Sequence, residues 1–247
     1  MKHLIALLIF IGIFSSNNLN ANHWEVNHIH KDCILAYVND GFSSLDFSKI
    51  YPKLNRLELF DRKVTSWEPK EKLEYLAQDD AGLSKNINLK VIYAWNDYCQ
   101  IPISLSYLPS VESFQNFLNG PYHDFDYLSQ SLPSLKTLIY SAALEYPKGT
   151  SFREKLPIRL NNISKLELLE NLTIDTNSDQ WGSRTFTDQE LEALSKMHRL
   201  KNFTLKITYY NKFEKPAFDK ETLQILRNLL PNTKVKIDFY LHLPQDD

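Results

Sequence analysis

Glycine, cysteine and methionine are scarce in this chain of 247 residues, which contains 6 Gly, 2 Cys and 2 Met. None of the glycines forms the Gly-rich strand-to-helix turn that holds phosphate in doubly wound nucleotide-binding folds. The chain also lacks the Gly-x-Ser-x-Gly and His-Glu-x-x-His patterns, which are typical of α/β-hydrolases and zinc proteases. We therefore expect no catalytic residues, no metal and no cofactor.

Charge of one sign is not concentrated anywhere in the sequence. The 28 Lys and Arg residues nearly balance the 30 Asp and Glu residues, so the net charge is −2, and no long basic block occurs. A protein that binds duplex nucleic acid needs a basic face to displace counterions from phosphates. The charge pattern therefore argues against a nucleic-acid partner, while an apolar content of 43% favours an ordered core.

One long apolar run is present, close to the first residue. Lys2 precedes the run from Leu4 to Phe14, and polar residues follow as far as Asn20. This order is typical of a secretory signal, and Ala21 is the expected cleavage position. The run is shorter than the roughly 20 apolar residues that cross a bilayer. We expect a secreted or periplasmic protein without a membrane span in its mature form; an uncleaved anchor is the alternative.

The two cysteines are Cys33 and Cys99. An even number of cysteines in an exported protein is consistent with a disulfide. Two separate buried thiols are equally consistent with the sequence, so both interpretations stay open.

A repeated spacing organises the chain: an apolar residue, a second one three positions later, and a third two positions after that. Each copy follows a helix-like stretch or a Leu-Pro break. A unit of this kind cannot bury its apolar face alone and has to stack on its neighbours. The clearest copies are Leu54-Leu57-Leu59, Leu135-Leu138-Tyr140, Leu169-Leu172-Ile174 and Leu200-Phe203-Leu205.

The repeats predict strands centred near residues 57, 91, 114, 138, 172, 203 and 235. Helix-like gaps between the strands are long enough for the crossovers that a parallel sheet requires. In the strand near residue 91 we place Leu89, Val91 and Tyr93 on the buried side. Helices are expected at 69–78, 124–132, 187–197 and 219–230, and the third begins with a capping box formed by Thr187 and Glu190.

Residues 185–205 are similar to the leucine-rich repeat in which a Thr-Asp turn starts a helix and a Leu-x-x-Leu-x-Leu strand follows. The segment from Leu156-Pro157 to Ile174 resembles the shorter form with a Leu-Pro start. The likeness is best over 156–210. It implies an α/β leucine-rich-repeat solenoid, a curved parallel sheet with helices on the convex side and irregular repeats, which recognises ligands on its concave face or rim and carries no chemistry.

We expect four segments: a signal peptide (1–21), an N-terminal capping segment (22–53), a leucine-rich-repeat domain (54–241) and a C-terminal tail (242–247). The alternative is a doubly wound α/β sheet, which usually carries the missing phosphate loop.

Strand positions that point away from the core form a mixed surface, which becomes more basic toward the C-terminal strands. Such a surface suits a protein or peptide partner, and Trp side chains in the loops after strands either anchor a partner or plug the core. The expected outward positions include Arg56, Glu58, Phe60, Lys90, Ile92, Thr137, Ile139, Asn171, Thr173, Asp175, Asn202, Thr204, Lys206, Lys234, Lys236 and Asp238. The candidate ligand-binding residues are Trp67, Trp95, Asp175, Trp181, Lys206, Tyr209 and Lys236.

Two further polar features receive structural interpretations. His23, His28 and His30 are interpreted as part of an exposed N-terminal stretch rather than as imidazole ligands of a metal. Three Asn-x-Ser/Thr sequons, at Asn162, Asn171 and Asn202, are interpreted as repeat positions, and their glycosylation is left open.

The sequence therefore predicts an exported, bacterial-type protein that binds a partner without catalysis. One alternative is an exported hydrolase or metal-dependent enzyme whose site is assembled from distant residues. Another is an inhibitory or structural module of the cell envelope. Partner identity and oligomeric state are left open.

Overall fold

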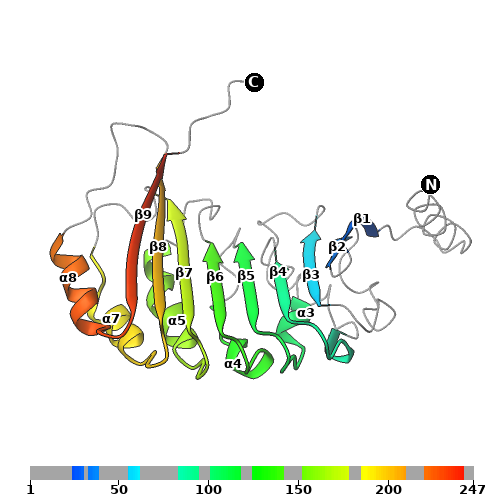
Figure 1. Ribbon diagram of the computed structural model, residues 1–247, viewed down its shortest axis with the longest axis horizontal. Coiled ribbons are helices and arrows are strands. Elements are labelled where there is room, and N and C mark those ends of the chain that lie inside the picture. Colours follow the sequence, from blue (N-terminus) through cyan, green and yellow to red (C-terminus); the bar gives the residue numbers. More distant parts are fainter. Residues whose placement is uncertain are drawn as a thin grey trace, which may run out of the picture.

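The computed structural model describes residues 24–30, 33–38, 55–61, 83–94, 101–117, 124–141, 152–177, 185–209 and 220–241. Their strands form one nine-stranded sheet whose order follows the chain from β1 to β9 (Figure 1). β1 and β2 are antiparallel, and every later pair up to β8 and β9 is parallel. The predicted α/β fold with a parallel sheet is confirmed.

The strands are β1 (Trp24–His30), β2 (Cys33–Val38), β3 (Arg56–Asp61), β4 (Val91–Ala94), β5 (Ser113–Phe117), β6 (Thr137–Ser141), β7 (Asn171–Asn177), β8 (Asn202–Tyr209) and β9 (Lys234–Leu241). The helices are the 3-10 turn η3 (Leu83–Lys85), α3 (Ile101–Ser104), α4 (Leu128–Ser131), α5 (Phe152–Ile163), α7 (Asp188–Ser195) and α8 (Lys220–Leu229).

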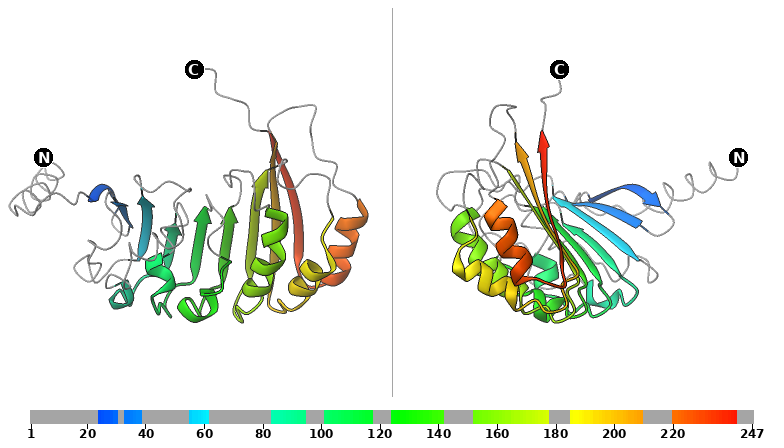
Figure 2. Two further views of the ribbon diagram at one scale, coloured as in Figure 1. Left: turned by 180° about the vertical axis from the view of Figure 1, so that it is seen from behind. Right: turned by 60° about the vertical axis from the view of Figure 1, so that its left-hand side comes forward.

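The helices form one layer. Successive helices from α3 to α8 contact one another, and Figure 2 shows α5, α7 and α8 side by side on one face of the sheet. We call the opposite face of the sheet the open face. Within the described ranges, every helix is too short or too polar to cross a lipid bilayer.

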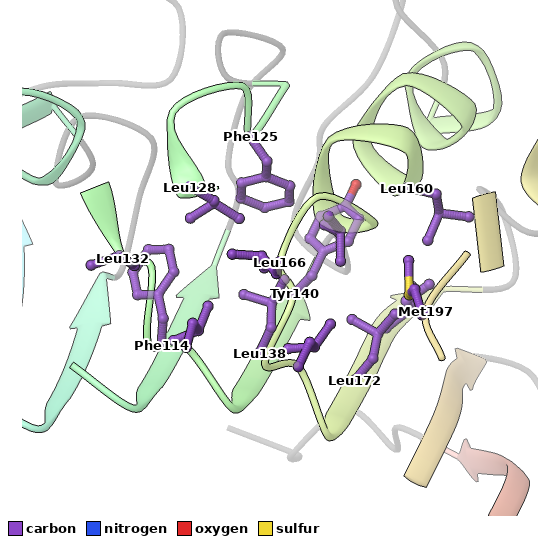
Figure 3. Packing of buried hydrophobic residues seen from close by; sticks show 14 of the residues in the cluster. Phe114, Phe125, Leu128, Leu132, Leu138, Tyr140, Leu160, Leu166, Leu172 and Met197 are labelled. Atoms are coloured by element: carbon purple, nitrogen blue, oxygen red, sulfur yellow. The ribbon is translucent and has the colours of Figure 1, made fainter. Parts of the chain in front are cut away.

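The core lies between the sheet and the helix layer. The motif residues pair in register across strands, as in Leu138 with Leu172 and Leu172 with Phe203, and all three are almost completely buried. In Figure 3, inward side chains of the strands, such as Leu138 and Leu172, point toward the helix layer, where Leu128 and Leu160 lie. Burial of each large apolar side chain contributes about 1.5–3 kcal/mol.

A recurring backbone hydrogen bond aligns the starts of the strands. The carbonyl of Glu112 accepts from the amides of Lys136 and Thr137 at 2.9 and 3.0 Å, and the carbonyl of Glu170 accepts from Lys201 at 2.7 Å. Equivalent positions of neighbouring repeats therefore lie in straight rows across the sheet.

The predicted facing of β4 is wrong. Ile92 and Ala94 are fully buried with Leu89, whereas Val91 and Tyr93 are only partly buried and alternate to the open face. Since side chains alternate along a strand, an error of one residue moves every side chain to the opposite face. The repeat in this strand is Leu89-x-x-Ile92-x-Ala94, so Ile92 is a core residue rather than an outward one.

The helix predictions have mixed outcomes. The capping box of α7 is confirmed, because the Thr187 hydroxyl accepts from the Glu190 amide at 3.3 Å and the Glu190 carboxylate accepts from the Thr187 amide at 2.8 Å. The expected helix at 124–132 is a single turn, α4. Pro157 lies inside α5 instead of starting a repeat.

The expected helix at 69–78 and the signal segment lie outside the described residues. Cys99 also lies outside them, whereas Cys33 is the first residue of β2.

Candidate binding surface on the open sheet face

Parallel register divides the open face into rows of side chains that cross the sheet. The first row contains Arg56, Val91, Ser113, Thr137, Asn171, Asn202 and Lys234; the second contains Glu58, Tyr93, Gln115, Ile139, Thr173, Thr204 and Lys236; and the third includes Ser141, Asp175, Lys206 and Asp238.

Charged side chains near both ends of the face are paired with each other. Toward the N-terminal side, Arg56 lies 2.6 Å from the Glu58 carboxylate and its guanidinium lies 4.3 Å from the centroid of the Tyr93 ring. On β9, the Lys236 ammonium lies 2.7 Å from the Asp238 carboxylate. The hydrogen bond to Asp238 raises the pKa of Lys236. These charged groups therefore form their ion pairs within the chain.

Hydrogen bonds between amide and hydroxyl side chains run along part of the first row. The Asn171 amide donates to the Thr137 hydroxyl at 3.1 Å, and the Asn202 amide donates to the Asn171 side-chain oxygen at 2.7 Å. Asn162 is buried, and its amide donates to the Asp124 carbonyl at 2.8 Å. All three sequon residues thus use the nitrogen that a glycan would modify, which favours their structural interpretation.

Asp175 and Lys206 lie outside the paired charges just described and are partly buried, unlike Lys234, which also forms no ion pair within the described residues but is exposed. They are neighbours in register on β7 and β8, and neither side chain forms a hydrogen bond or an ion pair within the described residues. Burial raises the pKa of the Asp175 carboxyl, and the charge of Lys206 partly offsets this. The Lys206 ammonium lies 6.0 Å from the centroid of the Tyr240 ring. Together they offer an anionic acceptor and a cationic donor side by side.

Hydroxyl groups extend this pair along the sheet. Thr173 and Thr204 are register partners in the second row, two residues before Asp175 and Lys206 respectively. Both threonines are partly buried. We call the group of Asp175, Lys206, Thr173 and Thr204 the central patch.

A second charged feature, which the sequence analysis missed, runs along the starts of the strands. The Glu112 carboxylate bridges Lys90 at 3.1 Å and Lys136 at 2.9 Å, and Glu170 pairs with Lys201 at 2.8 Å. We call this row the charge ladder. The signal was present in the sequence, because the residue after the first apolar position of successive repeats alternates between Lys and Glu. Since its members pair internally, the ladder supports the sheet rather than offering groups to a ligand.

The sequence analysis also missed a buried polar group. Arg159 is fully buried, and its guanidinium donates to the hydroxyl of Tyr140, which is also fully buried. The carboxylate of Asp124 lies 3.9 Å from the Arg159 Nε and 2.9 Å from the Lys155 ammonium. Position 159 falls on the helix face marked by Leu156, Leu160 and Ile163, which is the available sequence signal.

The structure brings together three of the predicted site residues. Asp175, Lys206 and Lys236 lie on the open face of β7, β8 and β9. Tyr209 ends β8 and alternates with Lys206, so it belongs to the side of Ile207, which faces the helices. The remaining predicted positions, Trp67, Trp95 and Trp181, lie outside the described residues.

The histidine stretch contributes two residues to β1, His28 and His30. In the part of the chain that the structure describes, no three His, Cys, Asp or Glu residues gather where they would hold a metal ion.

No protein-family model matches this chain, and no curated protein matches it in sequence.

Proposed function

We propose that this chain is an exported solenoid of the leucine-rich-repeat type that binds a protein or peptide partner through the central patch, without catalysis. Three features support the solenoid. The strand order runs without reversal, the helices form one layer, and the motif residues stack in register. A doubly wound sheet reverses its strand order and has helices on both faces.

The observation that carries the binding proposal is the pairing of charges across the open face. The charges of Arg56, Glu58, Lys236 and Asp238 are paired with each other. The side chains of Asp175 and Lys206 lack such partners within the described residues, and burial raises the pKa of the Asp175 carboxyl. Retaining a half-buried carboxylate without a hydrogen bond from its own chain's described residues lowers stability, and binding sites are where proteins accept such a loss.

The chemistry of the central patch indicates the kind of partner. A basic side chain of the partner would pair with Asp175, and a carboxylate or backbone carbonyl would accept from Lys206. The two threonine hydroxyls both donate and accept hydrogen bonds. A polypeptide segment that presents charges of both signs meets these requirements.

Photocrosslinking in the native compartment tests this proposal. A photoreactive amino acid at position 204 lies within the central patch, whereas the same residue at position 189 lies on the exposed surface of α7. We expect one specific partner to be captured from position 204 and not from position 189. Equal capture from both positions, or no specific adduct from position 204, would contradict the proposal.

Substitutions then measure the contribution of the charges to binding of the captured partner. Asp175→Ala and Lys206→Ala each remove one member of the pair, and we expect affinity to fall by about tenfold or more. Asp126→Ala and Lys196→Ala are matched controls, because both residues are exposed and lie at the turn before α4 and at the end of α7. Unchanged affinity in both patch variants would exclude this surface.

The export and the absence of catalysis are parts of the same proposal. Sequencing of the mature protein from the cell envelope or medium should begin directly after Ala21. The activity of the partner after mixing distinguishes the inhibitory module from a simple binding protein, because only the inhibitory module reduces that activity. Metal analysis of the purified protein separates both from the metal-dependent enzyme.

A further inference from the structure

Exposed apolar side chains lie on the turns that precede β4 and β5. Among the residues that the structure describes, Ile87, Tyr107 and Leu105 are the most exposed large hydrophobic ones, at 75%, 62% and 50%. Pro109 is exposed as well, and we call these four residues the edge patch. Because β4 and β5 are parallel, the turns before them lie at the same edge of the sheet, which is the lower edge in Figure 1.

Two hydrogen bonds connect these turns to each other. The Tyr107 amide donates to the Ser84 hydroxyl at 3.1 Å, and the Ser110 hydroxyl donates to the Leu89 carbonyl at 2.9 Å. Neighbouring strands of a sheet lie only about 5 Å apart. The apolar side chains of the two turns therefore belong to one surface rather than to two separate ones.

The repeat itself does not require apolar residues in these turns. Ile87 and Pro109 each lie two residues before the first apolar position of their repeats. The equivalent residues before β7 and β8 are Glu167 and His198, which are also exposed. A polar residue thus fits this position of the turn. Adjoining apolar side chains that remain exposed mark surfaces that bind a partner or a membrane.

Lysine side chains accompany the edge patch. Lys85 is exposed, lies two residues before Ile87 and forms no ion pair within the described residues. Lys90 and Lys136 both pair with Glu112, at 3.1 and 2.9 Å. At the starts of β4, β5 and β6, three described ammonium groups therefore accompany one carboxylate, which leaves an excess of positive charge beside the apolar side chains.

We infer that the edge patch docks on the surface of a lipid bilayer that carries anionic headgroups. Ile87, Leu105 and Tyr107 enter the boundary between headgroups and acyl chains, where apolar area is removed from water. A tyrosine suits this boundary, since its ring is apolar and its hydroxyl remains hydrated. The lysines stay at the level of the phosphates and attract the anionic lipids.

The position of the edge patch favours a bilayer over a protein partner. Its side chains extend from turns at an edge of the sheet, and a bilayer accepts such side chains without a matching groove. The core of a protein interface instead requires close complementarity of shape. Apolar and aromatic side chains next to lysines are also the combination that binds anionic membrane surfaces.

Sedimentation of the mature, full-length protein with lipid vesicles tests the inference. We expect binding to vesicles of phosphatidylcholine mixed with phosphatidylglycerol, weaker binding as salt is added, and little binding to phosphatidylcholine alone. Ile87→Ser combined with Tyr107→Ser should weaken binding by about tenfold or more, because two side chains that the bilayer buries are lost. Ile158→Ser is the matched control, since Ile158 is exposed on α5, and it should leave binding unchanged.

A second pair of variants tests the role of charge. Lys85→Gln should weaken binding to the anionic vesicles by about fivefold. Lys220→Gln makes the same change at an exposed position at the start of α8 and should have no effect. The edge-patch and lysine variants should melt at the temperature of the parent, because the side chains they replace are exposed. Lost binding is then separate from lost folding.

Three outcomes would overturn the inference. The first is a parent protein that binds neither kind of vesicle, or both kinds equally. The second is binding that neither the double variant nor Lys85→Gln weakens. The third comes from a photoreactive amino acid at position 87, because a specific adduct with a protein in the native compartment, in place of lipid, would assign the edge patch to a protein partner.

This inference does not rest on the proposed function, because the central patch lies on the open face of β7 and β8. Asp175→Ala and Lys206→Ala should reduce partner binding without changing vesicle binding. Failure of either proposal is therefore visible while the other stands.

Discussion

The hydroxyl of Tyr140 accepts a hydrogen bond from the guanidinium of Arg159 in the interior of the molecule, where both side chains are fully buried. Tyr140 occupies a repeat position that holds Ile or Leu in the following two repeats. The ring of Phe125 lies edge-on to it at 5.2 Å, and the backbone of Phe125 has a φ of 61°. Each polar group would lose a hydrogen bond in the core without the other, so the two positions depend on one another.

We expect Arg159→Met to lower the free energy of unfolding by about 1–3 kcal/mol and Tyr140→Phe by a similar amount, since each leaves a buried polar group with one fewer partner. The double variant should lose at least about 1 kcal/mol less than the sum of the two. Urea denaturation of the four proteins measures this coupling. Strictly additive losses would show that the hydrogen bond contributes nothing.

Glu112 is expected to stabilise the fold in a pH-dependent way. The hydrogen bond from Lys136, followed by that from Lys90, lowers the pKa of Glu112 below its ordinary value of 4.5. A pKa that is lower in the folded state adds stability above the unfolded pKa, and this stability is lost as pH falls through the folded pKa. Glu112→Gln should therefore melt at a slightly lower temperature than the parent at pH 7, and the difference should vanish in acid.

The exposed position of Glu112 gives this prediction two checks. Added salt should shrink the difference at pH 7, because exposed ion pairs are screened. Glu167→Gln removes an exposed carboxylate that forms no ion pair within the described residues. It should leave the melting temperature unchanged at either pH, and an equal effect of both substitutions would contradict a role of the charge ladder.

Local signals in the sequence predicted the helices and strands of this fold better than they predicted the contacts between these elements. The capping box needs only Thr187 and Glu190, three residues apart, so it could be read directly. The contact between Tyr140 and Arg159 joins a strand to the following helix, and the charge ladder needs the register of adjacent strands. Neither is fixed by spacing within one element. The prediction that Asp175 and Lys206 both point outward depended on recognising equivalent positions in two successive repeats.

The misplaced face of β4 shows the limit of reading one strand by itself. Leu89, Val91 and Tyr93 alternate as a strand should, but Leu89 precedes β4 and occupies the first position of the repeat. The second position lies three residues later, at Ile92, which changes the parity of the buried side. Comparison with the neighbouring repeats would have corrected the prediction, because Leu135 and Leu138 have the same spacing.

A pair of truncations in β4 tests the corrected facing. Ile92→Ala should lower the free energy of unfolding by about 2–5 kcal/mol, since it empties a fully buried position. Val91→Ala should lower it by less than about 1 kcal/mol, because Val91 is partly exposed on the open face. Chemical denaturation compares the two variants, and a reversed order would restore the original prediction.

Asp175→Asn should move stability and partner binding in opposite directions. Burial raises the pKa of Asp175 above its ordinary value of 3.8, so the charged form is less favourable in the folded chain than in the unfolded one. The parent therefore loses stability as pH rises through the folded pKa. The Asn variant should be more stable than the parent at pH 7, and the gain should fade as pH falls below the unfolded pKa.

The same substitution removes the negative charge of Asp175, which we propose pairs with a basic side chain of the partner. Affinity for the captured partner should fall, while the control Asp126→Asn should change neither stability nor affinity. Urea denaturation at pH 7 and in acid, together with a binding titration at pH 7, gives both readouts. A purely structural residue would lose stability on substitution. A residue kept for binding gains stability while it loses affinity, so a fall in both quantities would assign Asp175 to the fold instead.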